Sequence, residues 1–571
     1  MKLKRLLAFA VVAAMMISMT PAVVFAEETE SEPAETSVES SEPEEKETTK
    51  PSEEKPAEPE ETEPQESDPE DKEPADDGED EKTEAVPSDS ASVSSKEAIG
   101  TDGNIKWSYN ESNKTLTISP KKKKAAMPNY NYDWTPWKQY KNDITKVVIK
   151  KGITSIGSYA FYELPNLKSV TIPNGVKTIG FASFANSALT SLKLPKSVTS
   201  IGDFAFCMCT GLKAVTLSQK LKTISRGAFS GCGELISVTI PKKVTKIDTE
   251  AFYNCSKLQT LKILGPASIG EYAFGENISL KNLTLASGVK SIGIYAFINC
   301  ISLTGVKIPG SVSIIGHGAF STCENLVDVN LASGVKCIDE KAFFQCYALE
   351  KIVMPNSVTY IGKEAFKKSG LISAVISAGV TTIGENAFED CYKLTNVTIP
   401  YGVETIGVKA FYGCSRLTSV TLPSSVKKID NNAFQKCSKL VEVNMTKELK
   451  ENTSTDVWLG GSGNLKINEL VENPVTVKGK TAKVKAKKVK KKAQTVSASK
   501  LFTFSESGQK ALFVKASGNK KITINKYTGA VTVKKKLKKG TYTVKVKVMM
   551  TGNAKYKAGD WQTVTVKIKV K

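Results

Sequence analysis

Cysteine, histidine and paired carboxylates are the residues of this chain that could bind a metal or react covalently, and the cysteines are the most regularly placed. Nine of the eleven stand three residues after a recurring phenylalanine: Cys209, Cys232, Cys255, Cys300, Cys323, Cys346, Cys391, Cys414 and Cys437. The same position holds other residues elsewhere: Leu164, Ser187, Asn277 and Ser369. Because this position accepts Cys, Ser and Asn, we interpret it as a slot for a small side chain, with buried thiols that form a polar ladder.

Two other roles for the cysteines stay open at this point. A zinc site would combine Cys-x₂₋₄-Cys pairs with histidines. The chain offers one pair that comes near this pattern, Cys207 and Cys209, which are separated by only one residue, and it has a single histidine, His317. Disulfides between stacked neighbours would fit the Cα separations that disulfides tolerate. An odd number of cysteines leaves at least one thiol without a partner in its own chain.

Catalytic chemistry has little support in the sequence. A Ser-His-Asp or Cys-His site requires a histidine, and His317 is the only one. Glycoside hydrolysis requires two carboxylates at a set separation, whereas acidic residues such as Asp328, Glu350 and Glu442 are scattered. No Gly-rich phosphate loop follows a strand and opens a helix. We therefore expect no catalytic, cofactor-binding or metal site and no cofactor.

The elements that must position these residues repeat along the chain. Phenylalanine recurs every 22 or 23 residues, at 161, 184, 206, 229, 252, 274, 297, 320, 343, 366, 388, 411 and 434. An isoleucine precedes each by five residues, and a following L-x-x-V-x-I segment alternates like a strand with one buried face. A fixed period of this length predicts a solenoid, in which each unit covers the apolar residues of its neighbours. The expected fold is mainly β with short helical turns.

The repeat consensus V-T-x-I-G-x-x-A-F-x-x-C-x-x-L-x-x-V-x-I-P resembles the BspA-like leucine-rich repeats, also called the Treponema pallidum type, of bacterial surface and secreted proteins. The resemblance extends from about Ile105 to Met445, and the segment IKWSYNESNKTLTIS looks like the N-terminal cap of such proteins. It implies a leucine-rich repeat solenoid. It also implies adhesion to host proteins or to other bacteria.

The two ends of the chain differ from the repeats in composition. Three basic residues before an apolar run, with small residues near Ala26, predict a signal peptide over residues 1–26. Residues 27–98 are rich in Glu, Pro, Ser and Thr, and we expect a disordered acidic tether. The other expected boundaries are an N-terminal β cap at 99–150, the solenoid at 151–446 and a cap or linker at 447–473.

Residues 474–571 alternate Val or Ile with Lys or Thr between Gly-containing turns, which predicts a β-sandwich. The region resembles the Lys-rich Ig-like domains of bacterial secreted proteins. Residues 27–90 hold 28 acids and 5 lysines, whereas residues 474–571 hold 27 lysines and 2 acids. The formal net charge of +20 therefore combines an acidic block with a basic one.

Two sets of residues are candidates for ligand binding. The first is the outward position between the last two apolar residues of each strand: Thr171, Lys193, Thr216, Thr239, Lys262, Thr284, Lys307, Asn330, Thr398, Thr421 and Asn444. Threonine in this set would equally suit any half-exposed strand. The second set would bind polyanions, or would simply form a solvated face: Lys534, Lys535, Lys536, Lys538, Lys539, Lys545 and Lys547.

These observations predict a secreted or cell-surface binding protein without catalysis. We expect its partners to be host matrix proteins, extracellular proteins or other bacterial surface proteins, and anionic wall polymers or glycosaminoglycans for the basic region. Nucleic acid is not expected, nor is a transmembrane span once the signal peptide is removed. The competing hypothesis is a secreted glycoside hydrolase or wall-modifying enzyme with an unrecognised carboxylate site.

Overall fold

The structure is a computed structural model that describes residues 97–459, 465–506 and 510–571. The predicted signal peptide and all but the last two residues of the predicted tether lie outside the described residues. The N-terminal cap consists of β1 (Glu97–Asp102), β2 (Ile105–Asn110), β3 (Thr115–Pro120), β4 (Ala125–Ala126) and the 3₁₀ turn η1 (Lys138–Tyr140). β1 begins at Glu97, inside the segment predicted as tether.

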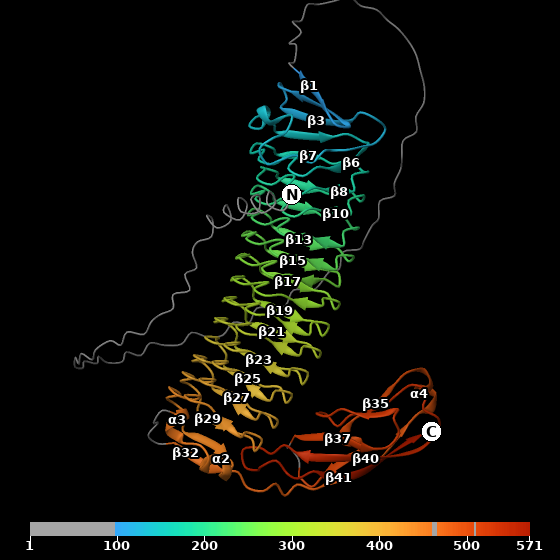
Figure 1. Cartoon of the computed structure of the whole chain (residues 1–571). Coiled ribbons are helices and arrows are strands. Elements are labelled where there is room, and N and C mark those ends of the chain that lie inside the picture. The colour runs from blue at the N-terminus through green and yellow to red at the C-terminus, as the bar shows by residue number, and fades with distance from the viewer. Residues whose placement is uncertain (1–96, 460–464, 507–509) are drawn as a thin grey trace, which may run out of the picture. The chain divides into compact units, whose positions relative to one another are not determined.

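Each repeat contributes two strands, and strands of neighbouring repeats pair in parallel (Figure 1). The first strand ends five residues before the repeat phenylalanine. These strands are β6 (Ile153–Ile156), β8 (Thr178–Ile179), β10 (Ser200–Ile201), β12 (Thr223–Ile224), β14 (Lys246–Ile247), β16 (Ser268–Ile269), β18 (Ser291–Ile292), β20 (Ile314–Ile315), β22 (Cys337–Ile338), β24 (Tyr360–Ile361), β26 (Thr382–Ile383), β28 (Thr405–Ile406) and β30 (Lys428–Ile429). Ten of them, from β12 to β30, form one continuous sheet.

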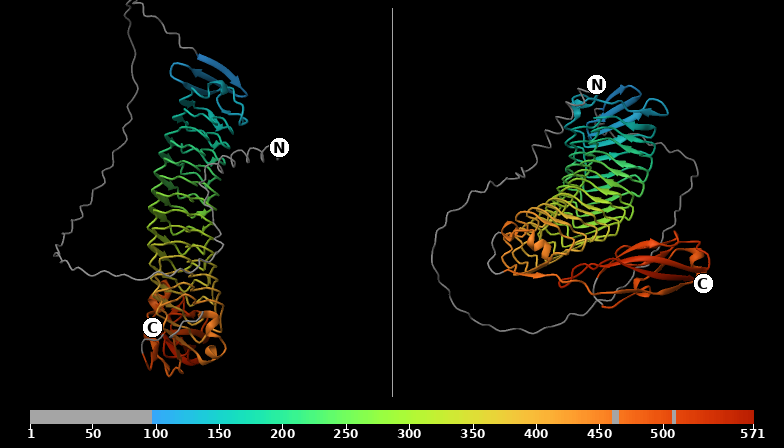
Figure 2. Two further views of the ribbon diagram at one scale, coloured as in Figure 1. Left: turned by 90° about the vertical axis from the view of Figure 1, so that its left-hand side faces the viewer. Right: turned by 60° about the horizontal axis from the view of Figure 1, so that its bottom comes forward.

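The second strand follows the phenylalanine and corresponds to the L-x-x-V-x-I segment. Together with β5 in the cap, these strands are β5 (Lys146–Ile149), β7 (Ser169–Thr171), β9 (Ser191–Lys193), β11 (Ala214–Thr216), β13 (Ser237–Ile240), β15 (Thr260–Ile263), β17 (Asn282–Leu285), β19 (Gly305–Ile308), β21 (Asp328–Leu331), β23 (Lys351–Val353), β25 (Ser373–Val375), β27 (Asn396–Thr398), β29 (Ser419–Thr421) and β31 (Glu442–Met445). The mainly β repeat solenoid predicted from the sequence is confirmed, and Figure 2 shows the same stacking from two further sides.

The repeat phenylalanines form one column through the core. All thirteen are at most 1% exposed. From Phe184 to Phe434, successive rings stack with centroids 5.1–5.6 Å apart and planes within 11° of parallel. Each ring is therefore covered by rings from the two neighbouring repeats, which explains why the pattern must recur in register.

The connection between the two strands of a repeat is a turn with an unusual backbone. The residues two before and two after each phenylalanine have positive φ, between 46° and 71°, although most of them are not glycine. Tyr159 and Glu163 are the first such pair, and both of them, like Phe161 between them, donate their backbone N–H groups to carbonyls of the next repeat. The backbone hydrogen bonds gained between repeats compensate for a conformation that is costly for L-residues.

A tryptophan closes the phenylalanine column at each end. Trp137 stacks on Phe161 at 5.8 Å and donates its indole N–H to the carbonyl of Ala160, 3.0 Å away. At the other end, Trp458 lies edge-on to Phe434, with ring centroids 5.8 Å apart. The C-terminal cap contains α2 (Lys447–Glu451), α3 (Thr455–Leu459) and β32 (Lys466–Glu469), which pairs with β31.

Residues from Val475 onward have their own hydrophobic core. The strands are β33 (Val477–Gly479), β34 (Thr481–Val484), β35 (Gln494–Val496), β36 (Phe502–Phe504), β37 (Ala511–Ser517), β38 (Ile522–Ile524), β39 (Val531–Val533), β40 (Gly540–Met550) and β41 (Gln562–Val570), with helix α4 (Ala486–Lys491) and the 3₁₀ turn η2 (Ala498–Lys500). They form sheets of order β34-β41-β40-β37, β35-β39-β38 and β33-β36. The Ig-like assignment of this region stays a prediction.

Candidate binding surfaces

The cysteine slot is a buried hydrogen-bonded ladder. All eleven cysteines lie in the described part of the chain and are free thiols. Each of the nine slot cysteines places its Sγ 3.2–3.4 Å from the carbonyl oxygen of the phenylalanine one repeat earlier. Asn277 makes the equivalent bond to Phe252 through its side-chain amide. The interpretation of the slot as buried thiols with a polar role is therefore confirmed.

Burial makes these thiols poor nucleophiles. It raises the pKa of Cys209 to about 11 and that of Cys391 to about 12, even though a neighbouring serine hydroxyl partly opposes the shift in each case. Nucleophilic attack and metal binding require the thiolate, which is scarce at neutral pH under these conditions. No group of three or more possible metal-ligating side chains occurs within the described residues.

The outward residues of the second strands, the first predicted ligand set, form a row across the solenoid. We call this set the strand row. Its members from Thr171 to Asn330 are exposed. Where neighbouring strands pair in register, successive members lie directly opposite one another, as for Lys262 between Thr239 and Thr284; the ladder is interrupted between β7 and β9 and between β17 and β19. Since the flanking apolar residues of these strands point into the core, the row is held on a rigid support.

The C-terminal end of the strand row is different. Thr398 and Thr421 are half-buried, and Asn444 is only 6% exposed. Asn444 donates to the hydroxyl of Thr421 and accepts from the amide of Asn468 in β32. Here the polar side chains bond to each other and to the cap, so the part of the row best placed to contact a partner runs from β7 to β21.

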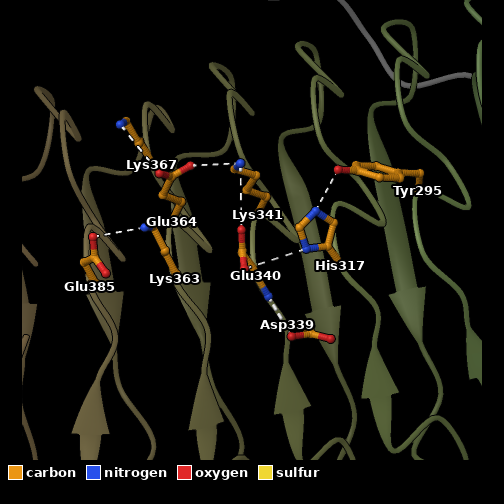
Figure 3. Close-up of polar contacts among 9 residues, drawn as sticks. All are labelled: Tyr295, His317, Asp339, Glu340, Lys341, Lys363, Glu364, Lys367 and Glu385. Atoms are coloured by element: carbon orange, nitrogen blue, oxygen red, sulfur yellow. Dashed lines mark hydrogen bonds and ion pairs between the residues drawn. The ribbon is translucent and has the colours of Figure 1, made fainter. Parts of the chain in front are cut away.

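His317 lies in a contact that no sequence pattern indicated (Figure 3). Its Nε2 is 2.7 Å from the hydroxyl of Tyr295 in the preceding repeat, and its Nδ1 is 4.0 Å from a carboxylate oxygen of Glu340 in the following one. Burial, and secondarily the charge of Glu340, raises the pKa of Tyr295. The histidine thus links three repeats.

Ion pairs continue from Glu340 along the turns of its own repeat and the next two, and Figure 3 draws these pairs apart from that of Lys367 with Glu389. The pairs and their distances are Lys341 with Glu340 at 3.8 Å and with Glu364 at 3.6 Å, Lys367 with Glu364 at 3.9 Å and with Glu389 at 2.9 Å, and Lys363 with Glu385 at 3.1 Å. Partly exposed pairs contribute about 0.2–1 kcal/mol each. Sequence reasoning missed this network because its members occupy the variable positions of the repeat, and the pairs that join two repeats are 22 or 23 residues apart.

The predicted polyanion-binding lysines divide into two groups. Lys534, Lys535, Lys536, Lys538 and Lys539 are exposed in the connection between β39 and β40. Lys545 and Lys547 instead lie on the outer side of β40, two residues apart on the same face of the sheet. The sequence grouped the seven by their density along the chain, whereas the structure distributes them over a loop and a sheet.

Within the described residues, no helix is long and apolar enough to cross a membrane. Comparison with curated proteins gives no significant match. Among solved structures, the chain is similar to a leucine-rich repeat protein from Bacteroides ovatus, with 23% identity over 65% of this chain and 100% of that one, at a TM-score of 0.47. A leucine-rich cell surface protein from Faecalibacterium prausnitzii matches at 26% identity over 63% of this chain and 99% of that one, at a TM-score of 0.32.

A third similar structure is the leucine-rich repeat protein of T. pallidum, with 18% identity over 55% of this chain and 88% of that one, at a TM-score of 0.21. The profile of the BspA type leucine rich repeat region matches residues 139–259, 264–372 and 359–456. These matches cover more than half of the chain and contain all thirteen repeat phenylalanines. The chain therefore belongs to the BspA type leucine-rich repeat family.

Proposed function

We propose that this protein acts outside the cell as a binding protein without enzymatic activity, and that the solenoid binds a protein partner through the strand row. The observation that carries the proposal is the row itself: eight exposed Thr, Lys and Asn side chains from Thr171 to Asn330, one per repeat. Their backbones are fixed by parallel pairing, so little conformational entropy is lost when a partner binds. Partners of this kind would be host matrix proteins, other extracellular proteins or bacterial surface proteins.

The proposed location, secreted or attached to the cell surface, rests on the signal peptide predicted over residues 1–26. Recovery of the protein from the culture medium or cell envelope with Glu27 as its first residue would support export. Retention of an intact N-terminus inside the cell would contradict it.

The basic C-terminal region is proposed to hold the protein at an anionic wall polymer or glycosaminoglycan. Residues 474–571 have 27 lysines and 2 acids, and such an excess of charge attracts polyanions over distances of about a Debye length.

No specific observation favours the competing hypothesis of a hydrolase. The glutamates around Lys341 and Lys367 are engaged in ion pairs with lysine. On the second strands, Asp328 lies opposite Lys351 in register, and the carboxylate of Glu442 accepts a hydrogen bond from Asn468 at 2.6 Å.

A paired substitution tests the strand row. The variant Thr239→Arg with Thr284→Arg places two large side chains on the row, and the matched control places the same residues at exposed Thr178 and Thr382 on the first strands. Binding to a panel of purified matrix proteins is measured by interferometry. We expect the row variant to lose at least about ten-fold in affinity for any matrix protein that the unmodified protein binds. Equal binding by both variants would contradict the proposal.

A further inference from the structure

The outer face of the sheet β34-β41-β40-β37 carries lysines from three strands. Along β34, along β41 from Thr563 and over residues 543–548 of β40, residues on this face alternate with core residues, and pairing in register brings exposed residues opposite exposed ones. Lys483 of β34 lies opposite Lys569 of β41, and Lys567 lies opposite Thr481 on one side and Thr543 on the other. Lys545 and Lys547 of β40 lie opposite Thr565 and Thr563. We call Lys483, Lys569, Lys567, Lys545 and Lys547 the lysine stripe.

None of the ion pairs among the described residues involves a lysine of the stripe. The only acids after residue 473 are Glu506 and Asp560, and neither lies on these strands. Of the lysines after residue 473, one, Lys557, takes part in ion pairs of the described residues. Like charges directly opposite each other on a sheet, as Lys483 and Lys569 are, destabilise the pairing. Among the described residues this repulsion has no compensating ion pair, and the rest of the face carries threonines together with Val514 and Ser517 of β37.

The positions of the stripe follow from sheet geometry. Neighbouring strands lie about 4.8 Å apart, and alternate residues on one strand about 6.8 Å apart. Successive lysines from Lys483 to Lys547 are therefore anchored roughly 5–8 Å from one another along a diagonal that crosses three strands. Threonine hydroxyls flank the diagonal and can donate additional hydrogen bonds. Such an arrangement suits an extended polymer with one anionic group per monomer better than a single small anion.

We propose that the lysine stripe is the site at which this protein binds a linear polyanion. The inference rests on the proposed function and deepens it: it assigns the polymer to the sheet rather than to the lysine-rich loop between β39 and β40. Three stripe members, Lys483, Lys567 and Lys569, were absent from the set predicted by sequence. Sulfated glycans and poly(polyol phosphate) chains share the required chemistry, a regular series of anionic groups, and two arms of the test distinguish them.

The test compares two variants of the full-length protein that lose the same charge from the same region. The stripe variant is Lys545→Gln, Lys567→Gln and Lys569→Gln; the loop variant is Lys535→Gln, Lys538→Gln and Lys539→Gln, all exposed positions. Affinity for heparin in one arm, and for poly(glycerol phosphate) in the other, is measured over a salt series. We expect the stripe variant to lose about ten-fold or more at 0.1 M salt and to show a shallower salt dependence, because fewer contacts release counterions. The loop variant should lose less than about three-fold.

Two further measurements keep the result interpretable. Thermal melting should show the stripe variant folded and at least as stable as the unmodified protein, because repulsion has been removed. Lys567→Arg with Lys569→Arg keeps the charge and should keep the affinity. Equal losses in the stripe and loop variants would overturn the inference and leave a diffuse role of the basic region standing. Absence of binding to both polymers by the unmodified protein would overturn that proposed role together with the inference.

Discussion

At the scale of single residues, the cysteine slot shows how one position serves the whole stack. A thiol there fills the volume beside the phenylalanine column and donates to the phenylalanine carbonyl of the preceding repeat, as Cys346 does to Phe320 at 3.2 Å. The sulfhydryl proton is part of this bond. Chemistry that removes the proton, such as ionisation or oxidation, therefore acts against the fold.

The slot thiols should react slowly with a thiol reagent under native conditions. Cys337 is the exception in exposure: it lies on β22 outside the slot and is half-buried, whereas the other ten cysteines are buried. At pH 8 we expect Cys337 to be modified first and the rest only at the rate of unfolding, because a reagent has no access to a buried thiol in the folded protein. Cys337→Ser should remove the early phase. Fast modification of several slot cysteines in the folded protein would contradict this expectation.

The same burial predicts that stability falls in alkaline solution. The folded pKa of Cys209 is about 11 and that of Cys391 about 12, above the ordinary value of 9.0. Below pH 9 the thiol is mainly protonated in both the folded and the unfolded chain, so the protein has its full free energy of unfolding. As the pH rises from 9 toward the folded pKa, only the unfolded chain ionises, and the free energy of unfolding falls. By pH 10, ionisation of each of these two thiols in the unfolded chain should lower the free energy of unfolding by about 1 kcal/mol.

Denaturant melts between pH 8 and pH 10 check this alkaline loss. The variant Cys209→Ser with Cys391→Ser places serine in the slot, where Ser187 and Ser369 stand in other repeats. Over that pH range its free energy of unfolding should fall by about 2 kcal/mol less than that of the unmodified protein. Parallel pH profiles for the two proteins would show that these thiols do not contribute. Lysines and tyrosines titrate in both proteins alike and cancel in the comparison.

Residue types in the slot could be predicted from sequence because the same position repeats and its substitutions reveal its environment. The contact of His317 with Tyr295 could not, because each partner occupies a position that varies from repeat to repeat. Tyr295 stands two residues before its phenylalanine and His317 three before the next. Only the left-handed turn geometry brings their side chains together across the repeat boundary.

At the scale of elements, the phenylalanine column couples each repeat to both neighbours. Phe297 stacks on Phe274 at 5.5 Å and on Phe320 at 5.2 Å, and all three rings are fully buried. The alternation of the strands and the position of the turns could be predicted from the period alone. The conformation of the turns could not, because positive φ at residues such as Glu250 and Lys341 is fixed by bonds to the next repeat and not by their type.

Replacing Phe297 with alanine should cost about 3–5 kcal/mol of unfolding free energy, since the neighbouring backbones are tied by parallel pairing and cannot close the cavity. Hydrogen exchange should accelerate in the repeats on both sides, because a solenoid is stabilised by nearest-neighbour contacts. Lys307→Ala, on the exposed side of the adjacent strand, is the control and should change stability by less than about 0.5 kcal/mol. A loss below about 1 kcal/mol for Phe297→Ala would show that the column is not essential.

At the scale of the whole molecule, opposite charges lie at opposite ends of the sequence. Residues 27–90 hold 28 acids and 5 lysines, and residues 474–571 hold 27 lysines and 2 acids. Composition alone reveals this separation. Composition does not indicate which lysines face the same way, and for Lys483, Lys567 and Lys569 that depends on the parallel pairing of β34 with β41, two strands more than eighty residues apart.

The acidic block, residues 27–90, should compete with external polyanions for the basic block, residues 474–571. An acidic segment of the same molecule is always present at high effective concentration, so it should occupy the basic region until a denser polyanion displaces it. A variant beginning at Ser95 removes the acidic block and keeps every described residue. At low salt this variant should bind heparin or poly(glycerol phosphate) more tightly than the full chain. The two should converge as salt shortens the Debye length from about 10 Å at 0.1 M. Identical binding curves at every salt concentration would rule out such self-masking, and weaker binding after truncation would mean that the acidic block assists polymer binding.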